Sequence, residues 1–138
     1  MNYYYEIKNR LISNEVYKKV KDYSKNKNDL DTYYEIGRLL IEAQGGEEHA
    51  KYGNKLIKEY SKKLYNENNL NYSERTLRRM RQFYIMFKDK KWSPLATKLT
   101  WSHYQELLVL KDKNEINYYI EQSINYNLSK RQLREKII

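Results

Sequence analysis

The side chains with the clearest chemistry lie between residues 73 and 87, in the segment SERTLRRMRQFYIMF. Guanidinium groups are planar cations with several donors, and they bind phosphates and base edges. A helical repeat of 3.6 residues places the cationic and amide side chains on one face and the apolar side chains on the other. The first set is Arg75, Arg78, Arg79 and Gln82, and the second is Leu77, Met80, Phe83, Tyr84 and Phe87. With Ser73 as N-cap, the pattern predicts a helix that presents a cationic face to a nucleic acid.

A second basic stripe is expected on the preceding helix, at 48–65. Its lysines recur at intervals of four, three and four residues, which keeps them on one side of a helix. They are Lys51, Lys55, Lys58 and Lys62, and the opposite side carries Tyr52, Leu56, Ile57, Tyr60 and Leu64. Such a stripe suits contacts with flanking phosphates, and a merely solvated helix face explains it equally well.

Three more cations, Lys130, Arg131 and Arg134, open the last expected helix. Cations at a helix N-terminus oppose the macrodipole, so either a nucleic-acid contact or solvation must favour them. Together with Arg75 to Arg81 they belong to a basic second part of the chain. Residues 1–50 hold 8 basic and 9 acidic side chains, whereas residues 51–138 hold 19 and 9. This concentration of charge indicates a polyanionic partner.

The sequence offers few catalytic groups. It has no cysteine and two histidines, His49 and His103, of which His103 is expected to be structural. We find no glycine-rich phosphate loop and no paired-carboxylate nuclease pattern. The sequence therefore predicts no catalytic residue, no metal, no cofactor and no enzymatic activity.

The 138 residues, with one proline and four glycines, predict one compact all-α domain of several helices. Residues 1–47 would form N-terminal helices, and residues 48–138 a basic part that resembles a helix-turn-helix. No apolar run is long enough to span a membrane, and the absence of cysteine fits the cytoplasm. Helices are predicted at 3–25 with a break near residues 13–14, at 29–44 after a turn at 25–28, at 48–65, at 73–87, at 101–110, at 115–125 and at 130–137.

Five blocks of sequence follow one another in a familiar order, at 34–38, 52–57, 72–84, 98–108 and 128–134. In this pattern the chain resembles the N-terminal helical domain of YhcG-type PD-(D/E)XK nuclease-family proteins. The resemblance implies an all-helical, helix-turn-helix-related fold with a role at DNA. It also implies a C-terminal nuclease domain, for which a chain ending at Ile138 leaves no residues. The chain is then either a stand-alone version of the binding domain or a fragment of a longer protein.

Two functions follow as hypotheses. The first is a non-catalytic nucleic-acid-binding module, with DNA ahead of RNA as the ligand, that uses the arginine helix. The second is a protein-interaction module, such as a phage- or plasmid-encoded inhibitor of a bacterial nucleic-acid-guided nuclease, whose basic face meets an acidic protein surface. The oligomeric state stays open, a dimer included.

Overall fold

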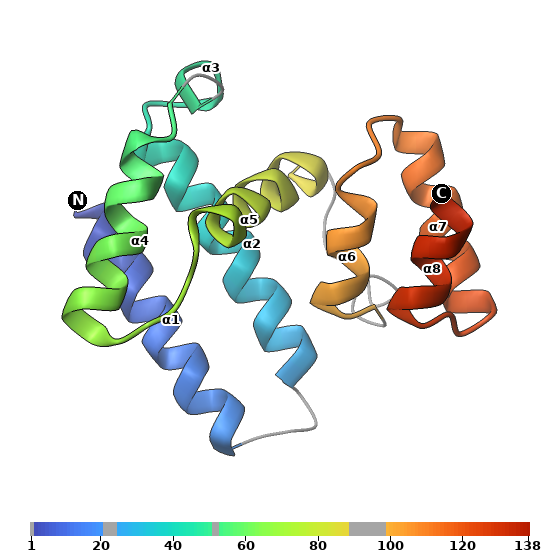
Figure 1. Ribbon diagram of the computed structural model, residues 1–138, viewed down its shortest axis with the longest axis horizontal. Coiled ribbons are helices and arrows are strands. Elements are labelled where there is room, and N and C mark those ends of the chain that lie inside the picture. Colours follow the sequence, from blue (N-terminus) through green and yellow to red (C-terminus); the bar gives the residue numbers. More distant parts are fainter. Residues whose placement is uncertain (1, 21–24, 51–52, 89–98) are drawn as a thin grey trace. The chain divides into compact units, whose positions relative to one another are not determined.

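The computed structural model describes residues 2–20, 25–50, 53–88 and 99–138 (Figure 1). Within these residues the chain forms helices and no strand, which confirms the all-α prediction. None of these helices is long and apolar enough to cross a membrane. The helices are α1 (Tyr3–Val20), α2 (Lys25–Ala43), α3 (Glu47–Ala50), α4 (Lys55–Asn68), α5 (Glu74–Phe87), α6 (Trp101–Leu107), α7 (Lys113–Asn125) and α8 (Lys130–Ile137).

The chain divides into two compact units, Met1–Ile85 and Met86–Ile138, and the boundary falls in the last turn of α5. The predicted division near residue 47 stays a prediction. In the first unit α1 and α2 lie side by side, and apolar side chains from α1, α2, α4 and α5 form its core. These buried residues are Tyr4, Ile7, Leu11, Leu30, Tyr33, Ile36, Leu39, Leu40, Ile41, Ile57, Leu64, Leu77, Met80 and Phe83.

Helix α5 packs on α2 through aromatic rings. The ring of Tyr34 lies 6.3 Å from that of Phe83 and 5.0 Å from that of Tyr84, measured between centroids. The apolar face of α5 is therefore the face that the sequence predicts, and its burial leaves the opposite face of the helix for other contacts.

The second unit has a smaller core, built from Phe87, Leu99, Tyr104, Leu107, Ile116 and Leu133. Phe87 and Tyr104 meet edge to face, with ring centroids 5.4 Å apart. Helix α8 packs on α6 and α7. The predicted helices at 101–110 and 115–125 have the bounds Trp101–Leu107 and Lys113–Asn125.

Two predictions in the first helical hairpin are wrong. Helix α1 continues through Ser13 and Asn14 without a break. Helix α2 begins at Lys25, whereas a turn at 25–28 and a helix start at residue 29 are expected. The buried Asn14 amide donates a 3.0 Å hydrogen bond to the Asp29 carboxylate. Both residues therefore link α1 to α2 from inside their helices, and this tertiary contact outweighs their weak local preference for caps.

The helix predicted at 48–65 is also wrong in its bounds. The chain instead forms the short α3 and then α4, with Gly53 and Asn54 between them outside any helix. Lys51 and Tyr52 lie outside the described residues. Asn69, in the left-handed conformation at φ 54°, ends α4. Its N–H donates to the Tyr65 carbonyl, and the N–H of the next residue, Leu70, donates to the Leu64 carbonyl. The stretch predicted as a loop at 66–72 is therefore residues 69–73.

Candidate nucleic-acid interface

The basic face of α5 has the predicted composition. Ser73 caps the helix, since its hydroxyl accepts a 3.1 Å hydrogen bond from the Thr76 N–H. Arg75 and Gln82 are exposed, and Arg78 is half-buried. Among the described residues, neither Arg75 nor Arg78 has an ion-pair or hydrogen-bond partner. Arg79 is half-buried and interacts within the chain. The face therefore holds two guanidinium groups whose donors are available to a ligand.

Arg81 does not belong to this face. Its Nη1 donates a 2.8 Å hydrogen bond to Gln44 Oε1, and its Nη2 donates one of 3.4 Å to Asn54 Oδ1. Burial, reinforced by the charge of Arg78, lowers the pKa of Arg81. Arg81 thus holds the end of α2 against the start of α4, and its role is structural.

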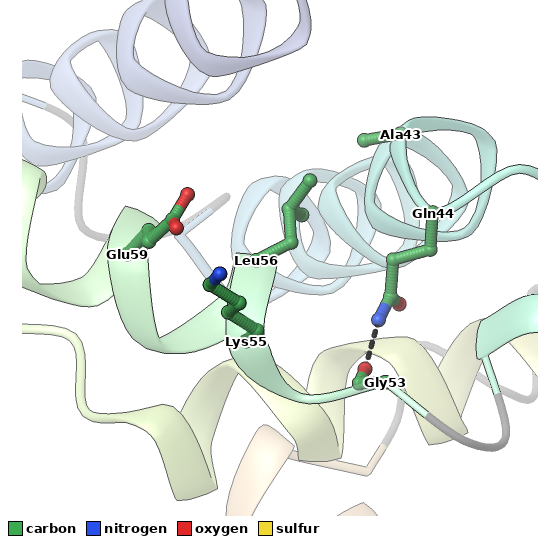
Figure 2. Close-up of a pocket in the computed structure, with 6 residues that line it drawn as sticks. All are labelled: Ala43, Gln44, Gly53, Lys55, Leu56 and Glu59. Carbon is green, nitrogen blue, oxygen red and sulfur yellow. Dashed lines mark hydrogen bonds between the residues drawn. The ribbon is translucent and has the colours of Figure 1, made fainter.

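An open pocket of about 420 Å³ lies in the same region, between the end of α2 and the first turns of α4 (Figure 2). The Gln44 amide donates to the Gly53 carbonyl across it. Lys55 and Glu59 line the pocket together with Ala43 and Leu56.

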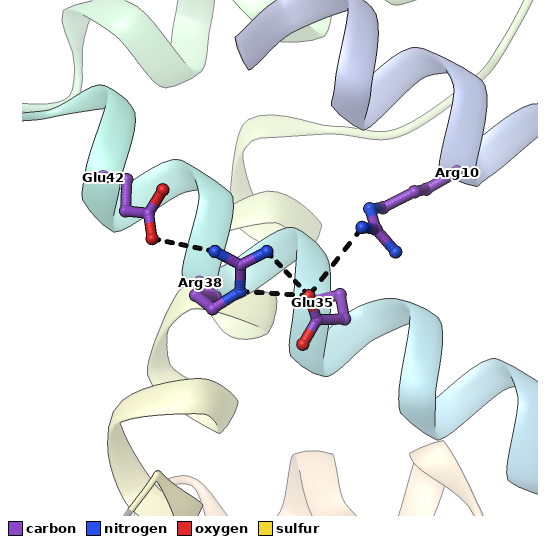
Figure 3. A network of polar contacts seen from close by, with 4 residues as sticks. All are labelled: Arg10, Glu35, Arg38 and Glu42. Atoms are coloured by element: carbon purple, nitrogen blue, oxygen red, sulfur yellow. Dashed lines mark hydrogen bonds and ion pairs between the residues drawn. The ribbon is translucent and has the colours of Figure 1, made fainter. Parts of the chain in front are cut away.

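The acidic side chains of α2 are engaged within the first helical hairpin (Figure 3). Glu35 accepts from Arg38 at 2.9 and 3.0 Å and lies 4.0 Å from Arg10, and Glu42 accepts from Arg38 at 2.8 Å. These hydrogen bonds raise the pKa of Arg38. Glu35 and Glu42 therefore bind arginines of α1 and α2 and do not neutralise the arginines of α5.

The lysine stripe is shorter and less uniform than predicted. Lys55, Lys58 and Lys62 are exposed on α4, opposite the buried Ile57 and Leu64. Lys51 precedes α4 and lies outside the described residues. Glu59 is also exposed, one helical turn from Lys55 and from Lys62, so the stripe carries less net charge than a count of its lysines suggests.

An open groove of about 450 Å³ joins the C-terminal half of α4 to the first turn of α5. Lys62 lines it and so do Ser73 and Glu74, which places the end of the lysine stripe beside the start of the arginine helix. The groove also contains Tyr65, Asn66 and Asn71, which are not among the predicted site residues. A signal was present, because Tyr65 follows Lys58 by seven residues and Lys62 by three, and therefore lies on the lysine face of α4.

The two arginines of α8 are paired, in contrast to Arg75. Arg134 forms a two-pronged ion pair with Glu106 of α6, at 2.7 and 3.0 Å, which raises the pKa of its guanidinium. Arg131 lies 3.4 Å from Glu135 on its own helix, and Lys130 is exposed. Arg134 thus connects two helices of the second unit.

His103 makes hydrogen bonds with both of its ring nitrogens. Its Nδ1 lies 2.8 Å from the Thr100 hydroxyl and 3.2 Å from the Thr100 backbone nitrogen, which donates to it. Its Nε2 lies 2.7 Å from the Leu128 carbonyl oxygen. The imidazole therefore completes the cap of α6 and joins it to the segment before α8.

Comparison with known proteins shows the family to which the chain belongs. The profile of the DUF1016 N-terminal domain matches residues 6–138. The chain belongs to the DUF1016 N-terminal domain family. The "Putative nuclease YhcG" of Escherichia coli (strain K12) is 32% identical to it, in an alignment that covers 77% of this chain and 36% of that protein. The chain thus spans about a third of the length of this relative, and no solved structure matches it.

Proposed function

We propose that this member of the DUF1016 N-terminal domain family is a non-catalytic DNA-binding module. The α5 face of Arg75, Arg78, Arg79 and Gln82 would contact the duplex, and Lys55, Lys58 and Lys62 of α4 would contact flanking phosphates. The observation that carries the proposal is the availability of the Arg75 and Arg78 guanidinium groups on a helix whose opposite face is buried. Paired donors in a rigid fork are the groups that read guanine and clamp phosphate.

Two further observations support the proposal. The basic excess lies in residues 51–138, as expected for a polyanion-binding surface. The relative carries the name "Putative nuclease YhcG", and nucleases act on nucleic acids. The alignment covers only 36% of YhcG. We therefore propose that this chain shares the nucleic acid as its ligand, and we do not propose that it cleaves nucleic acids.

The test is the salt dependence of binding to labelled duplex DNA, measured by fluorescence anisotropy for wild type and for Arg75→Ala and Arg78→Ala. Loss of a base contact should cost about 1–3 kcal/mol, and loss of a phosphate contact should reduce the slope of log K against log salt by about one. The matched control is Arg10→Ala, which removes the same charge from α1. Absence of binding at low salt, or an equal loss in Arg10→Ala, would contradict the proposal.

The second candidate is a protein-interaction module, such as an inhibitor of a bacterial nucleic-acid-guided nuclease. It is favoured by apolar side chains left exposed in the second unit, namely Val109, Tyr118 and Tyr126, because aromatic residues are enriched in protein interfaces. A pull-down from host lysate, with and without nuclease treatment, separates the candidates. A protein partner retained after removal of nucleic acid supports this one.

A further inference from the structure

The loop that joins α4 to α5, along the groove defined above, is held in place by hydrogen bonds. The Ser61 hydroxyl donates a 2.7 Å hydrogen bond to the Tyr72 carbonyl, and the Leu70 N–H donates to the Leu64 carbonyl. The Tyr72 hydroxyl donates a 2.6 Å hydrogen bond to Glu15 of α1, and burial together with this carboxylate raises the pKa of Tyr72. The loop between the helices is therefore held on both sides, and the groove exists before any ligand arrives.

The rim of the groove carries groups that the fold does not use. Tyr65 is 58% exposed, so its apolar ring is open to solvent. Asn66 and Asn71 are exposed, and among the described residues neither side-chain amide has a hydrogen-bond partner; the same is true of the Lys62 ammonium group. An aromatic platform, two amides and a cation thus surround a space of about 450 Å³.

This set of groups matches one ligand class. Unpaired nucleobases stack on aromatic rings and offer donors and acceptors at their exposed edges, and their phosphates pair with lysine. Glu74 lines the groove at the start of α5. Its carboxylate repels a phosphate there and accepts from an exocyclic amine of a base. The charges therefore favour the phosphate at Lys62 and the base edge toward Glu74.

We infer that the α4–α5 groove binds an unpaired nucleotide, with its base stacked on Tyr65 and its edge read by Asn66 and Asn71. This inference rests on the proposed function and narrows it. DNA bound by α5 would be recognised best where it contains a single-stranded or extruded base beside the duplex. The exposed face of Tyr65 supplies the stacking surface, and the hydrogen-bonded loop keeps the amides in place.

The test uses a short single-stranded DNA that contains 2-aminopurine, whose fluorescence is quenched when the base stacks. Wild type should quench the probe. Tyr65→Ala should abolish the quenching and weaken single-strand binding about tenfold, the loss expected for one stacked base. Tyr65→Phe keeps the ring and should restore both signals. Since Tyr65 is exposed, the folds of all variants should match by circular dichroism.

The matched control is Tyr126→Ala, which removes a tyrosine that is 67% exposed, somewhat more than Tyr65, from the second unit. It should behave as wild type. Quenching that persists in Tyr65→Ala, or that Tyr126→Ala removes to the same extent, overturns the inference. If wild type binds duplex DNA through Arg75 but does not quench the single-stranded probe, the inference about the groove is wrong and the DNA-binding proposal still holds. If wild type binds neither duplex nor single-stranded DNA, both the DNA-binding proposal and the inference about the groove are wrong.

Discussion

Gly37 of α2 lies directly against the backbone of α5 at Met80. A β-carbon at position 37 would overlap the Met80 carbonyl oxygen and would lie 2.8 Å from the β-carbon of Tyr84. Two helix backbones therefore approach at this point more closely than any larger residue allows. Since Met80 and Tyr84 belong to α5, Gly37 sets the position of the arginine helix on the core of the first unit.

The first prediction concerns this crossing. Alanine in a helix interior normally stabilises a protein by about 0.5–1 kcal/mol relative to glycine. Gly37→Ala should do the opposite and lower the free energy of unfolding by about 1–3 kcal/mol, because the methyl group forces the helices apart. Urea denaturation measures the change. A neutral or stabilising effect would show that α5 can shift at no cost.

The second prediction concerns Tyr4, whose hydroxyl donates a 2.8 Å hydrogen bond to Glu67 and accepts one of 3.2 Å from Asn68. Burial, together with Glu67, raises the pKa of Tyr4 to about 12. Below the unfolded pKa of about 10 both states keep the proton. Between about pH 10 and about pH 12 only the unfolded state releases it, so the free energy of unfolding falls as pH rises.

Tyr4→Phe should therefore make the loss of stability between about pH 9 and about pH 11 less steep, while it costs about 1 kcal/mol at neutral pH through the lost hydrogen bond. Urea midpoints at both pH values provide the measurement. Because other buried tyrosines also titrate at high pH, the relevant quantity is the difference between variant and wild type. Parallel pH profiles would mean that Tyr4 has no raised pKa.

The third prediction concerns the cap of α6. His103→Ala removes the side-chain acceptor of the Thr100 N–H and the contact with Leu128, and it should destabilise the second unit by about 1 kcal/mol or more. His103→Gln should cost less, since glutamine is a usual partner in this type of cap. Thermal unfolding of both variants tests the order. Equal losses would indicate that the Leu128 contact, rather than the cap, carries the stabilisation.

The fourth prediction separates Arg134 from Arg75. Arg134 pairs with Glu106 within the second unit, whereas Arg75 has no such partner among the described residues. Arg134→Ala should lower the melting temperature and change the salt slope of DNA binding little. Arg75→Ala should leave the melting temperature unchanged and reduce the slope by about one. A larger effect on DNA binding from Arg134→Ala would place the interface on α8.

The helical class and the two faces of α5 can be predicted from the amino-acid sequence alone. Both follow from local physics, because helical periodicity, the Ser73 cap and the contrast between Leu77 and Arg78 act within a few residues of one another. The same holds for the caps of α6 and α8, where the side chains of Thr100 and Ser129 accept a hydrogen bond from the backbone N–H of the third residue of the helix.

The packing of the helices determines which polar groups remain available. Arg38, Arg81 and Arg134 look like Arg75 in the sequence, yet each has its guanidinium group occupied. The partners of Arg81 and Arg134 lie in another part of the chain, and those of Arg38 lie about one turn away on its own helix. Tertiary contacts also explain why α2 begins at Lys25. The hydrogen bond between Asn14 and Asp29 stabilises the protein more than a helix cap at either residue would. Pairings over such separations depend on how the helices pack, and no local pattern encodes them.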